Sequence, residues 1–163
     1  MKKMFFAGAL ALALGACGAS TTEPQRYEVP VDYREPVGAV VVKLGLSTEE
    51  VPVFETMGLS ENGTGEDFRW MRVVRAGELQ NTYSSENGFH PADAREMLAF
   101  YAKHPEAVPE KGLCAPGDQL PLGEGMTGVP VITQAGRLGV FAHGCSKPGR
   151  RVLVVRDFTR SRP

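Results

Sequence analysis

Three cysteines are the residues of this chain with the widest choice of chemistry: Cys17, Cys114 and Cys145. A thiol can be alkylated, oxidised to a disulfide, deprotonated to a nucleophile or used as a metal ligand. Cys17 ends an apolar run and is followed by small and polar residues, whereas the other two lie in the second half of the chain. These surroundings predict that Cys17 has a role of its own, whereas Cys114 and Cys145 act as a pair.

The segment before Cys17 has the pattern of a secretory signal peptide. Lys2 and Lys3 form a short positive region, and an uninterrupted apolar run, MFFAGALALAL, covers residues 4–14. As a helix, this run would reach only ~17 Å at about 1.5 Å per residue, well short of a bilayer core of roughly 30 Å. Charges, glycine or proline interrupt every later apolar run. The sequence therefore predicts an exported protein whose signal peptide is residues 1–16.

The last residues of this segment, Leu14, Gly15, Ala16 and Cys17, resemble the lipobox of bacterial lipoprotein precursors. The resemblance implies that the thiol of Cys17 receives a diacylglycerol and that a peptidase cuts between Ala16 and Cys17. In many members of the family the new amino group gains a further acyl chain. Two or three chains would anchor the protein firmly, because each buried methylene contributes about 0.8 kcal/mol. The implied partner is thus a membrane, reached through the lipid on Cys17.

The residue after the lipid cysteine indicates whether the anchor lies in the inner or the outer membrane. In enteric bacteria an Asp there tends to retain lipoproteins in the inner membrane, and this chain has Gly18. The analogy implies the outer membrane, with the protein facing the periplasm. Residues 17–25 are small and polar and predict a flexible tether. An ordinary signal peptide, cleaved after small residues without lipidation, is the alternative.

Cys114 and Cys145 form an even pair once Cys17 is assigned to lipid. In an exported protein such a pair is expected to be a disulfide. It would close a loop of about 32 residues, and loop-closure entropy gives roughly 3 to 4 kcal/mol of stabilisation. A thiol nucleophile or a metal ligand in the string His143-Gly144-Cys145 is the alternative.

No familiar catalytic or metal-binding pattern occurs in the sequence. GxSxG, SxxK, HExxH and CxxC are all absent, and the remaining histidines, His90 and His104, are scattered. The string GEGMTG at residues 123–128 lacks the lysine of a phosphate-binding loop. We therefore expect no catalytic residue, no metal site and no cofactor.

Charge is unevenly distributed along the chain. Residues 146–163 contain six basic residues and one acidic residue, a net charge of +5, whereas residues 18–145 contain 10 basic and 18 acidic residues, a net charge of −8. A basic segment of this kind can meet phosphate-bearing lipids or an acidic partner. The same arginines could instead guard an exposed strand edge against unwanted pairing. The acidic total and the export signal argue against nucleic-acid binding.

Apolar periodicity predicts a single α+β domain over residues 26–163. The predicted strands cover residues 26–33, 37–46, 51–54, 68–75, 78–83, 129–133, 137–142 and 151–158. Pro30 places the first strand at a sheet edge. One helix is predicted over about 91–104, with Pro91 in its first turn and an apolar stripe that includes Met97 and Leu98. The expected fold is a mainly antiparallel, twisted sheet of six to eight strands with this helix packed on one face.

Residues 105–130 are rich in proline and glycine and predict a long loop, which the disulfide of Cys114 would attach to the rest of the domain.

Three functions remain open. The first is a lipid-anchored, non-catalytic binding or scaffolding module whose partner is an envelope protein, peptidoglycan or an anionic lipid. The second is an inhibitor or accessory subunit that acts through the loop 105–128. The third is a small hydrolase or ligand carrier, which a pocket lined by Arg72, His90 or His143 would favour.

Overall fold

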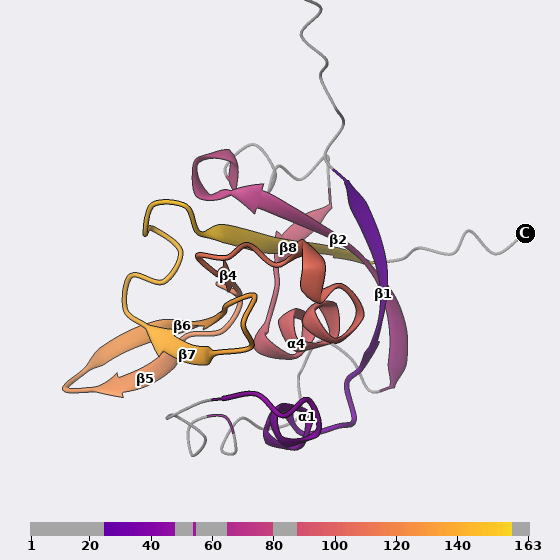
Figure 1. The fold of residues 1–163 in the computed structure, drawn as a ribbon, viewed down its shortest axis with the longest axis horizontal. Helices are drawn as coiled ribbons and strands as arrows, with labels where there is room; N and C mark the ends of the chain where they lie inside the picture. Colours follow the sequence, from indigo (N-terminus) through magenta and orange to yellow (C-terminus); the bar gives the residue numbers. More distant parts are fainter. Residues whose placement is uncertain (1–24, 48–53, 55–64, 80–87, 158–163) are drawn as a thin grey trace, which may run out of the picture.

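The computed structural model describes residues 25–47, 54, 65–79 and 88–157 (Figure 1). Its strands are β1 (Arg26–Asp32), β2 (Glu66–Arg75), β3 (Phe89–Pro91), β4 (Leu113–Cys114), β5 (Leu120–Gly123), β6 (Met126–Ile132), β7 (Leu138–Phe141) and β8 (Arg151–Asp157). The described helices are α1 (Val37–Lys43) and α4 (Ala94–Lys103), with the short 3-10 helices η1 (Ala76–Glu78) and η2 (Pro105–Ala107). Cys17 and the predicted tether up to residue 24 lie outside the described residues.

The eight strands form one sheet, which confirms the predicted α+β class. The main path through it has the order β1-β2-β8-β4-β6-β5, while β3 also pairs with β8 and β7 with β6. The β4–β8 pair is parallel, and the other pairs between these strands are antiparallel. β1 is at the end of the path, as Pro30 predicts, because proline cannot donate a hydrogen bond to a further strand. β8 lies between β2 and β4, so its arginines guard no sheet edge.

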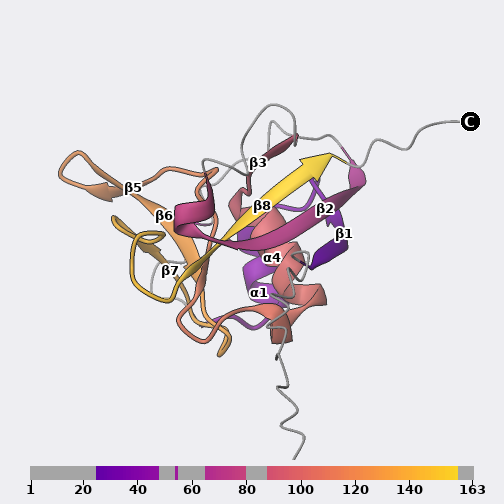
Figure 2. The ribbon, with the colours of Figure 1, turned by 90° about the horizontal axis from the view of Figure 1, so that it is seen from above.

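The helix α4 packs on one face of the sheet (Figures 1 and 2). Met97, Leu98 and Phe100 on this helix are fully buried and belong to the same core cluster as Val29 of β1 and Val155 of β8. The apolar stripe seen in the sequence therefore forms the main core. α1 contacts α4 on the same side of the sheet (Figure 2).

The start of α4 differs from the sequence prediction. The helix begins at Ala94, and Pro91 is the last residue of β3, where it pairs with Val154. Asp93 caps the helix: its carboxylate accepts a hydrogen bond from the backbone N–H of Glu96 at 2.8 Å, and the Glu96 carboxylate accepts one from the backbone N–H of Asp93 at 2.9 Å. This reciprocal pair satisfies two otherwise unpaired N–H groups, and so it determines where the helix begins.

The strand predicted over residues 37–46 is wrong, because Val37–Lys43 forms the helix α1. Val37 and Val41 are buried at a spacing of four, while Val42 is 72% exposed. A helix gives this one-sided burial, whereas the valine triplet favours a strand only by local propensity. Packing of the Val37 and Val41 face against the core therefore overrides the β-propensity of the valines.

The strands predicted over residues 51–54 and 78–83 are not observed at the residues that the structure describes. The segment after β2 forms the 3-10 helix η1, so the predicted strand at 78–83 is wrong at Glu78, and residues 80–83 lie outside the described residues. Phe54 is fully buried in helical conformation, which contradicts a strand there, and 51–53 are not described. The hairpin at 129–142 is confirmed by the pairing of β6 with β7, and β8 confirms the last predicted strand.

A second apolar cluster covers the sheet face opposite α4. Successive strand residues point to opposite faces. Leu113 therefore joins the main core, whereas its neighbour Cys114 joins a smaller cluster with Val131, Val152 and Val154, against which Cys145 packs. The long predicted loop is thus partly a strand inserted into the sheet.

The rest of the predicted loop is also ordered into strands. β5 pairs with β6 through the turn Gly123-Glu124-Gly125, in which all three residues have positive φ angles. This hairpin projects from the body of the domain (Figure 1). Across the part of the chain that the structure describes, no helix is both long enough and apolar enough to cross a membrane.

Candidate ligand-binding surface around the disulfide

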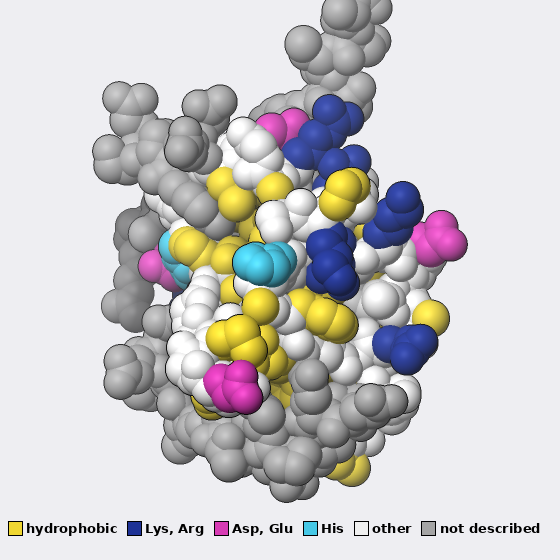
Figure 3. All heavy atoms as spheres, turned by 90° about the vertical axis from the view of Figure 1, so that its left-hand side faces the viewer, with side chains coloured by type: hydrophobic (Ala, Val, Ile, Leu, Met, Phe, Trp, Pro, Cys, Tyr) yellow, Lys and Arg dark blue, Asp and Glu magenta, His cyan; other side chains and the backbone are white. Residues whose placement is uncertain are grey.

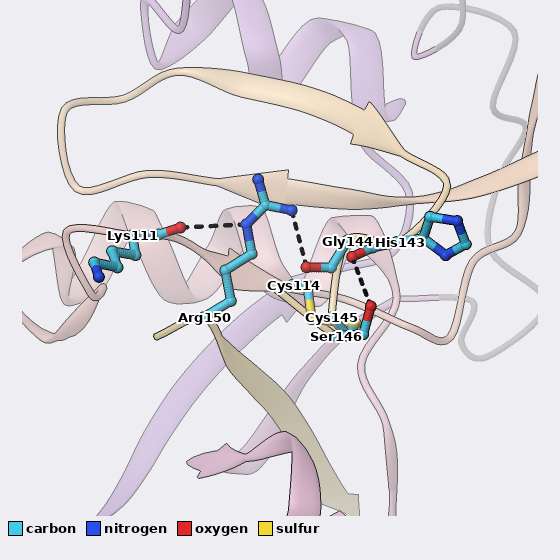
Figure 4. The surroundings of a disulfide bond; sticks show 7 residues. All are labelled: Lys111, Cys114, His143, Gly144, Cys145, Ser146 and Arg150. Carbon is cyan, nitrogen blue, oxygen red and sulfur yellow. Dashed lines mark hydrogen bonds between the residues drawn. A yellow bond between two sulfur atoms is a disulfide. The ribbon is translucent and has the colours of Figure 1, made fainter. Parts of the chain in front are cut away.

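The structure confirms the predicted disulfide between Cys114 and Cys145 (Figure 4). Cys114 is fully buried in β4, and Cys145 lies in the loop between β7 and β8, with 5.6 Å between the two Cα atoms. Because both sulfur atoms are bonded, neither is available as a nucleophile or a metal ligand. The alternative chemistry considered for His143 and Cys145 is therefore wrong in this structure. The side chain of His143 is exposed on the loop.

The disulfide places the loop 142–150 directly on the sheet. At Gly144 a Cβ atom would lie 2.5 Å from Cγ2 of Val129 and 2.9 Å from Cγ2 of Val131, so a larger residue does not fit without a shift. The backbone N–H of Gly144 donates to the carbonyl oxygen of Phe141 at 3.0 Å. Glycine and the disulfide together hold this loop close to β6.

Arg150 joins the loop to the segment before Cys114. Its Nη1 donates a hydrogen bond to the carbonyl oxygen of Gly144 at 2.9 Å, and its Nε donates to that of Lys111 at 3.3 Å (Figure 4). The guanidinium carbon also lies 4.6 Å from the centroid of the Phe141 ring, which is a cation–π contact. Desolvation by burial lowers the pKa of Arg150, but a guanidinium stays protonated at neutral pH.

Phe141 is the apolar centre of this surface. It is 38% exposed, and Nζ of Lys147 lies 5.5 Å from its ring centroid, in addition to Arg150. We call Lys111, Phe141, His143, Lys147 and Arg150 the disulfide face. The corresponding side of the molecule, at the left of Figure 1, carries basic, histidine and hydrophobic side chains close together (Figure 3).

Several basic residues outside the disulfide face pair with carboxylates, although Lys103, Arg137, Arg151 and Arg156 form no ion pair among the described residues. Arg34 pairs with Asp32, Lys43 with Glu35, Arg75 with Glu78, and Arg69 with both Asp67 and Asp157. Within the described ranges, no ion pair includes Lys111, Lys147 or Arg150. The surface therefore has uncompensated positive charge around an exposed aromatic ring, an arrangement that suits an anionic ligand.

A second group of charged residues is buried beneath α4. The Glu96 carboxylate accepts a hydrogen bond from the Tyr33 hydroxyl at 2.7 Å, and Arg69 Nε donates to that hydroxyl at 2.8 Å. Burial, followed by the negative charge of Asp93, raises the pKa of Glu96 to about 7. Glu96 is fully buried and also accepts the capping hydrogen bond from Asp93. These contacts assign the group a structural role, which is to hold the start of α4 against β1 and β2.

None of the hollows formed by described residues is lined by Arg72, His90 or His143. The guanidinium of Arg72 lies 4.8 Å from the centroid of Phe89, His90 Nδ1 lies 3.1 Å from the carbonyl oxygen of Pro91, and His143 is on the loop after β7. Three hollows among the described residues are lined by other residues: a wide, open one of about 480 Å³ along α1, and two of about 250 and 200 Å³. The hollow of about 250 Å³ is lined by Pro30, Asp32, Glu35, Val40, Lys43, Leu44, Glu66, Arg95, Ala99, Ala102 and Lys103, and that of about 200 Å³ by Arg26, Trp70, Phe89, Arg156 and Asp157.

Sequence reasoning missed the disulfide face, although a signal for it exists. Lys111 stands three positions before Cys114, and Lys147 and Arg150 stand two and five positions after Cys145. A disulfide between these cysteines brings the two segments that carry the basic residues close together. The predicted basic segment at 146–163 is instead divided, because Arg156 is at the far end of β8 from Arg151. Arg160 and Arg162 lie outside the described residues.

The comparisons with known proteins identify no relative of this chain, so its function has to be inferred from its own residues. No protein-family model matches the chain, and no curated protein or solved structure shows significant similarity to it. In the described residues, no group of three or more His, Cys, Asp or Glu side chains could hold a metal ion.

Proposed function

We propose that this chain is a lipid-anchored protein of the bacterial cell envelope and that its domain is a non-catalytic binding module. The observation that carries the proposal is the Cys114–Cys145 disulfide. Disulfides persist in oxidising compartments such as the periplasm, and this bond leaves Cys17, in its lipobox-like setting, for the lipid. The implied acyl chains tether the domain to the outer membrane through residues 17–25, on the periplasmic side.

The disulfide face supports the binding role of the domain. Lys147 and Arg150 lie over the ring of a partly exposed phenylalanine, and Lys111 lies on the adjacent segment. None of the three forms an ion pair among the described residues, which suits an anionic component of the envelope, since anions are drawn to uncompensated positive charge. The surface is held rigidly by the disulfide and by the hydrogen bonds of Arg150. Such preorganisation lowers the entropy that would be lost on binding.

Metabolic labelling tests the lipid anchor. Bacteria expressing the chain are given an alkyne-bearing fatty acid, and the purified protein is probed for the label. We expect label on the wild type and none on Cys17→Ala. The matched control, Cys114→Ala with Cys145→Ala, removes two cysteines but keeps Cys17, and it should retain the label. An unlabelled wild type that is released into the soluble periplasmic fraction would point to an ordinary signal peptide and overturn the proposal.

A second candidate function is an inhibitor or accessory subunit that acts through residues 105–128. The observation that favours it is the projecting β5–β6 hairpin, whose exposed turn is followed by Met126 with 52% exposure. A projecting hairpin can insert an apolar side chain into a partner. Replacing residues 123–126 by a two-residue turn, while Cys114 and the core residue Leu122 are kept, should then abolish capture of a partner enzyme without lowering thermal stability. Unchanged capture would exclude this candidate.

A further inference from the structure

The two lysines and the arginine of the disulfide face are brought together by the fold from two distant segments. Lys111 precedes β4, while Lys147 and Arg150 belong to the loop before β8, and the disulfide joins the two segments. Glu110 is the sequence neighbour of Lys111, but in the described part of the chain it forms no ion pair with any of the three cations. Lys147 and Arg150 both lie over the ring of Phe141, so their like charges are close together, and a bound anion would relieve their repulsion. The fold thus maintains a surface that is suited to a negatively charged partner.

Phe141 gives this surface an apolar centre as well as charge. Its ring is 38% exposed although the guanidinium of Arg150 lies only 4.6 Å from its centroid. Phenylalanine beside basic residues can enter the boundary between headgroups and acyl chains, and long basic side chains can keep their charged ends among the phosphates. Guanidinium groups match phosphate geometry particularly well. An exposed ring with two cations against it, and Lys111 on the adjacent segment, is therefore suited to a headgroup layer.

We propose that the disulfide face lies against the anionic phospholipid headgroups of the membrane that carries the Cys17 anchor. This inference rests on the proposed function, because the anchor supplies the membrane. A tether of nine residues spans at most about 30 Å at 3.3–3.6 Å per residue, so the domain would stay within reach of the bilayer surface. Each basic residue near an anionic leaflet contributes about 1 kcal/mol, or roughly fivefold in affinity.

Lysine labelling of the complete, lipidated protein tests the inference. The protein is reconstituted into vesicles of phosphatidylcholine alone or of phosphatidylcholine with phosphatidylglycerol, and the rate of acetylation at each lysine is followed by mass spectrometry. We expect Lys111 and Lys147 to react several-fold more slowly on the anionic vesicles, with the difference lost at 1 M salt, where the Debye length is only about 3 Å. Lys43 and Lys103, which line the hollow between α1 and α4, are internal controls and should react equally on both.

Single substitutions make the test specific to this face. Lys111→Gln should weaken the vesicle-dependent protection of Lys147, whereas the matched control Lys103→Gln should leave it unchanged. Equal acetylation of Lys111 and Lys147 on both kinds of vesicle would overturn the inference. Protection that requires added peptidoglycan fragments or an acidic envelope protein would also overturn it, in favour of that partner. Failure of the anchor is distinct, since the protein would then lack acyl mass and would not float with the vesicles.

Discussion

The side chain of Arg150 reaches across the loop before β8 and donates a hydrogen bond from Nη1 to the carbonyl oxygen of Gly144, at 2.9 Å. Its Nε donates at the same time to the carbonyl oxygen of Lys111, in the segment that leads to Cys114. Arg150 therefore ties together the same two segments that Cys114 and Cys145 join covalently. The shape of the disulfide face depends on both connections.

Replacement of Arg150 by alanine should lower the free energy of unfolding by about 1 to 2 kcal/mol. Two backbone carbonyls would lose a charged donor, and hydrogen bonds to charged groups contribute about 1.5 to 3 kcal/mol each when they are well shielded. Arg137→Ala is the matched control, because the Arg137 side chain is exposed, and it should change stability by less than about 0.5 kcal/mol. Urea unfolding measures both. Equal effects of the two substitutions would contradict the role given to Arg150.

Loss of the disulfide should lower the free energy of unfolding by about 2 to 5 kcal/mol. Cys114→Ala with Cys145→Ala removes the bond and its constraint on the unfolded chain. Urea unfolding of the wild type with and without a reductant gives the same comparison without a substitution. The double variant should be insensitive to the reductant. If the reductant leaves the wild type equally stable, the bond either does not form or does not constrain the chain.

The buried Glu96 carboxyl predicts a loss of stability as the pH rises. Its pKa is raised from 4.5 to about 7, so between these values the folded state binds more protons than the unfolded state. Stability is then greatest below about pH 4.5 and falls as the pH approaches about 7. Urea unfolding from pH 4.5 to 8 should show a shallower decline for Glu96→Gln than for the wild type.

The control for this pH series is Glu110→Gln, which removes an exposed carboxylate. Its stability should follow the wild-type curve throughout the series, because contributions from the other titrating groups are common to all three proteins. A Glu96→Gln curve parallel to that of the wild type would show that Glu96 does not titrate in this range.

The two faces of α1 provide a direct test of the helix that replaces a predicted strand. Val41 is 2% exposed, and Val41→Ala should lower the free energy of unfolding by about 1 to 3 kcal/mol through lost apolar burial. Its neighbour Val42 is 72% exposed, and Val42→Ala should be nearly neutral or slightly stabilising, since alanine is the better helix former. Thermal or urea unfolding distinguishes them. A larger loss for Val42→Ala would mean that the opposite face is buried.

Much of the sheet could be predicted from local pattern. The alternation around Pro30 identifies an edge strand, and the apolar runs on both sides of residues 134–136 identify the β6–β7 hairpin. These features depend on periodicity and turn chemistry, which are local. The disulfide was predicted from the number of cysteines together with the predicted export. The valine triplet of α1 misled prediction because only its neighbours in space decide which valines are buried.

The candidate binding surface depends on long-range contacts, and the sequence reveals it only in part. Lys111 and Arg150 are 39 positions apart and meet because β4 inserts beside β8 and the disulfide joins the loops. Phe141 resembles any apolar strand residue until its exposure is known. The composition of residues 146–163 predicted a basic segment, yet only its first part, with Lys147 and Arg150, contributes to the disulfide face.

The intact mass of the protein extracted from bacterial membranes with detergent tests the central claim most directly. A lipid-anchored protein should give a chain that begins at Cys17 and carries the added mass of a diacylglyceryl group, with or without a further acyl chain. A chain that retains Met1, or one that is cleaved but carries no lipid, would contradict the account.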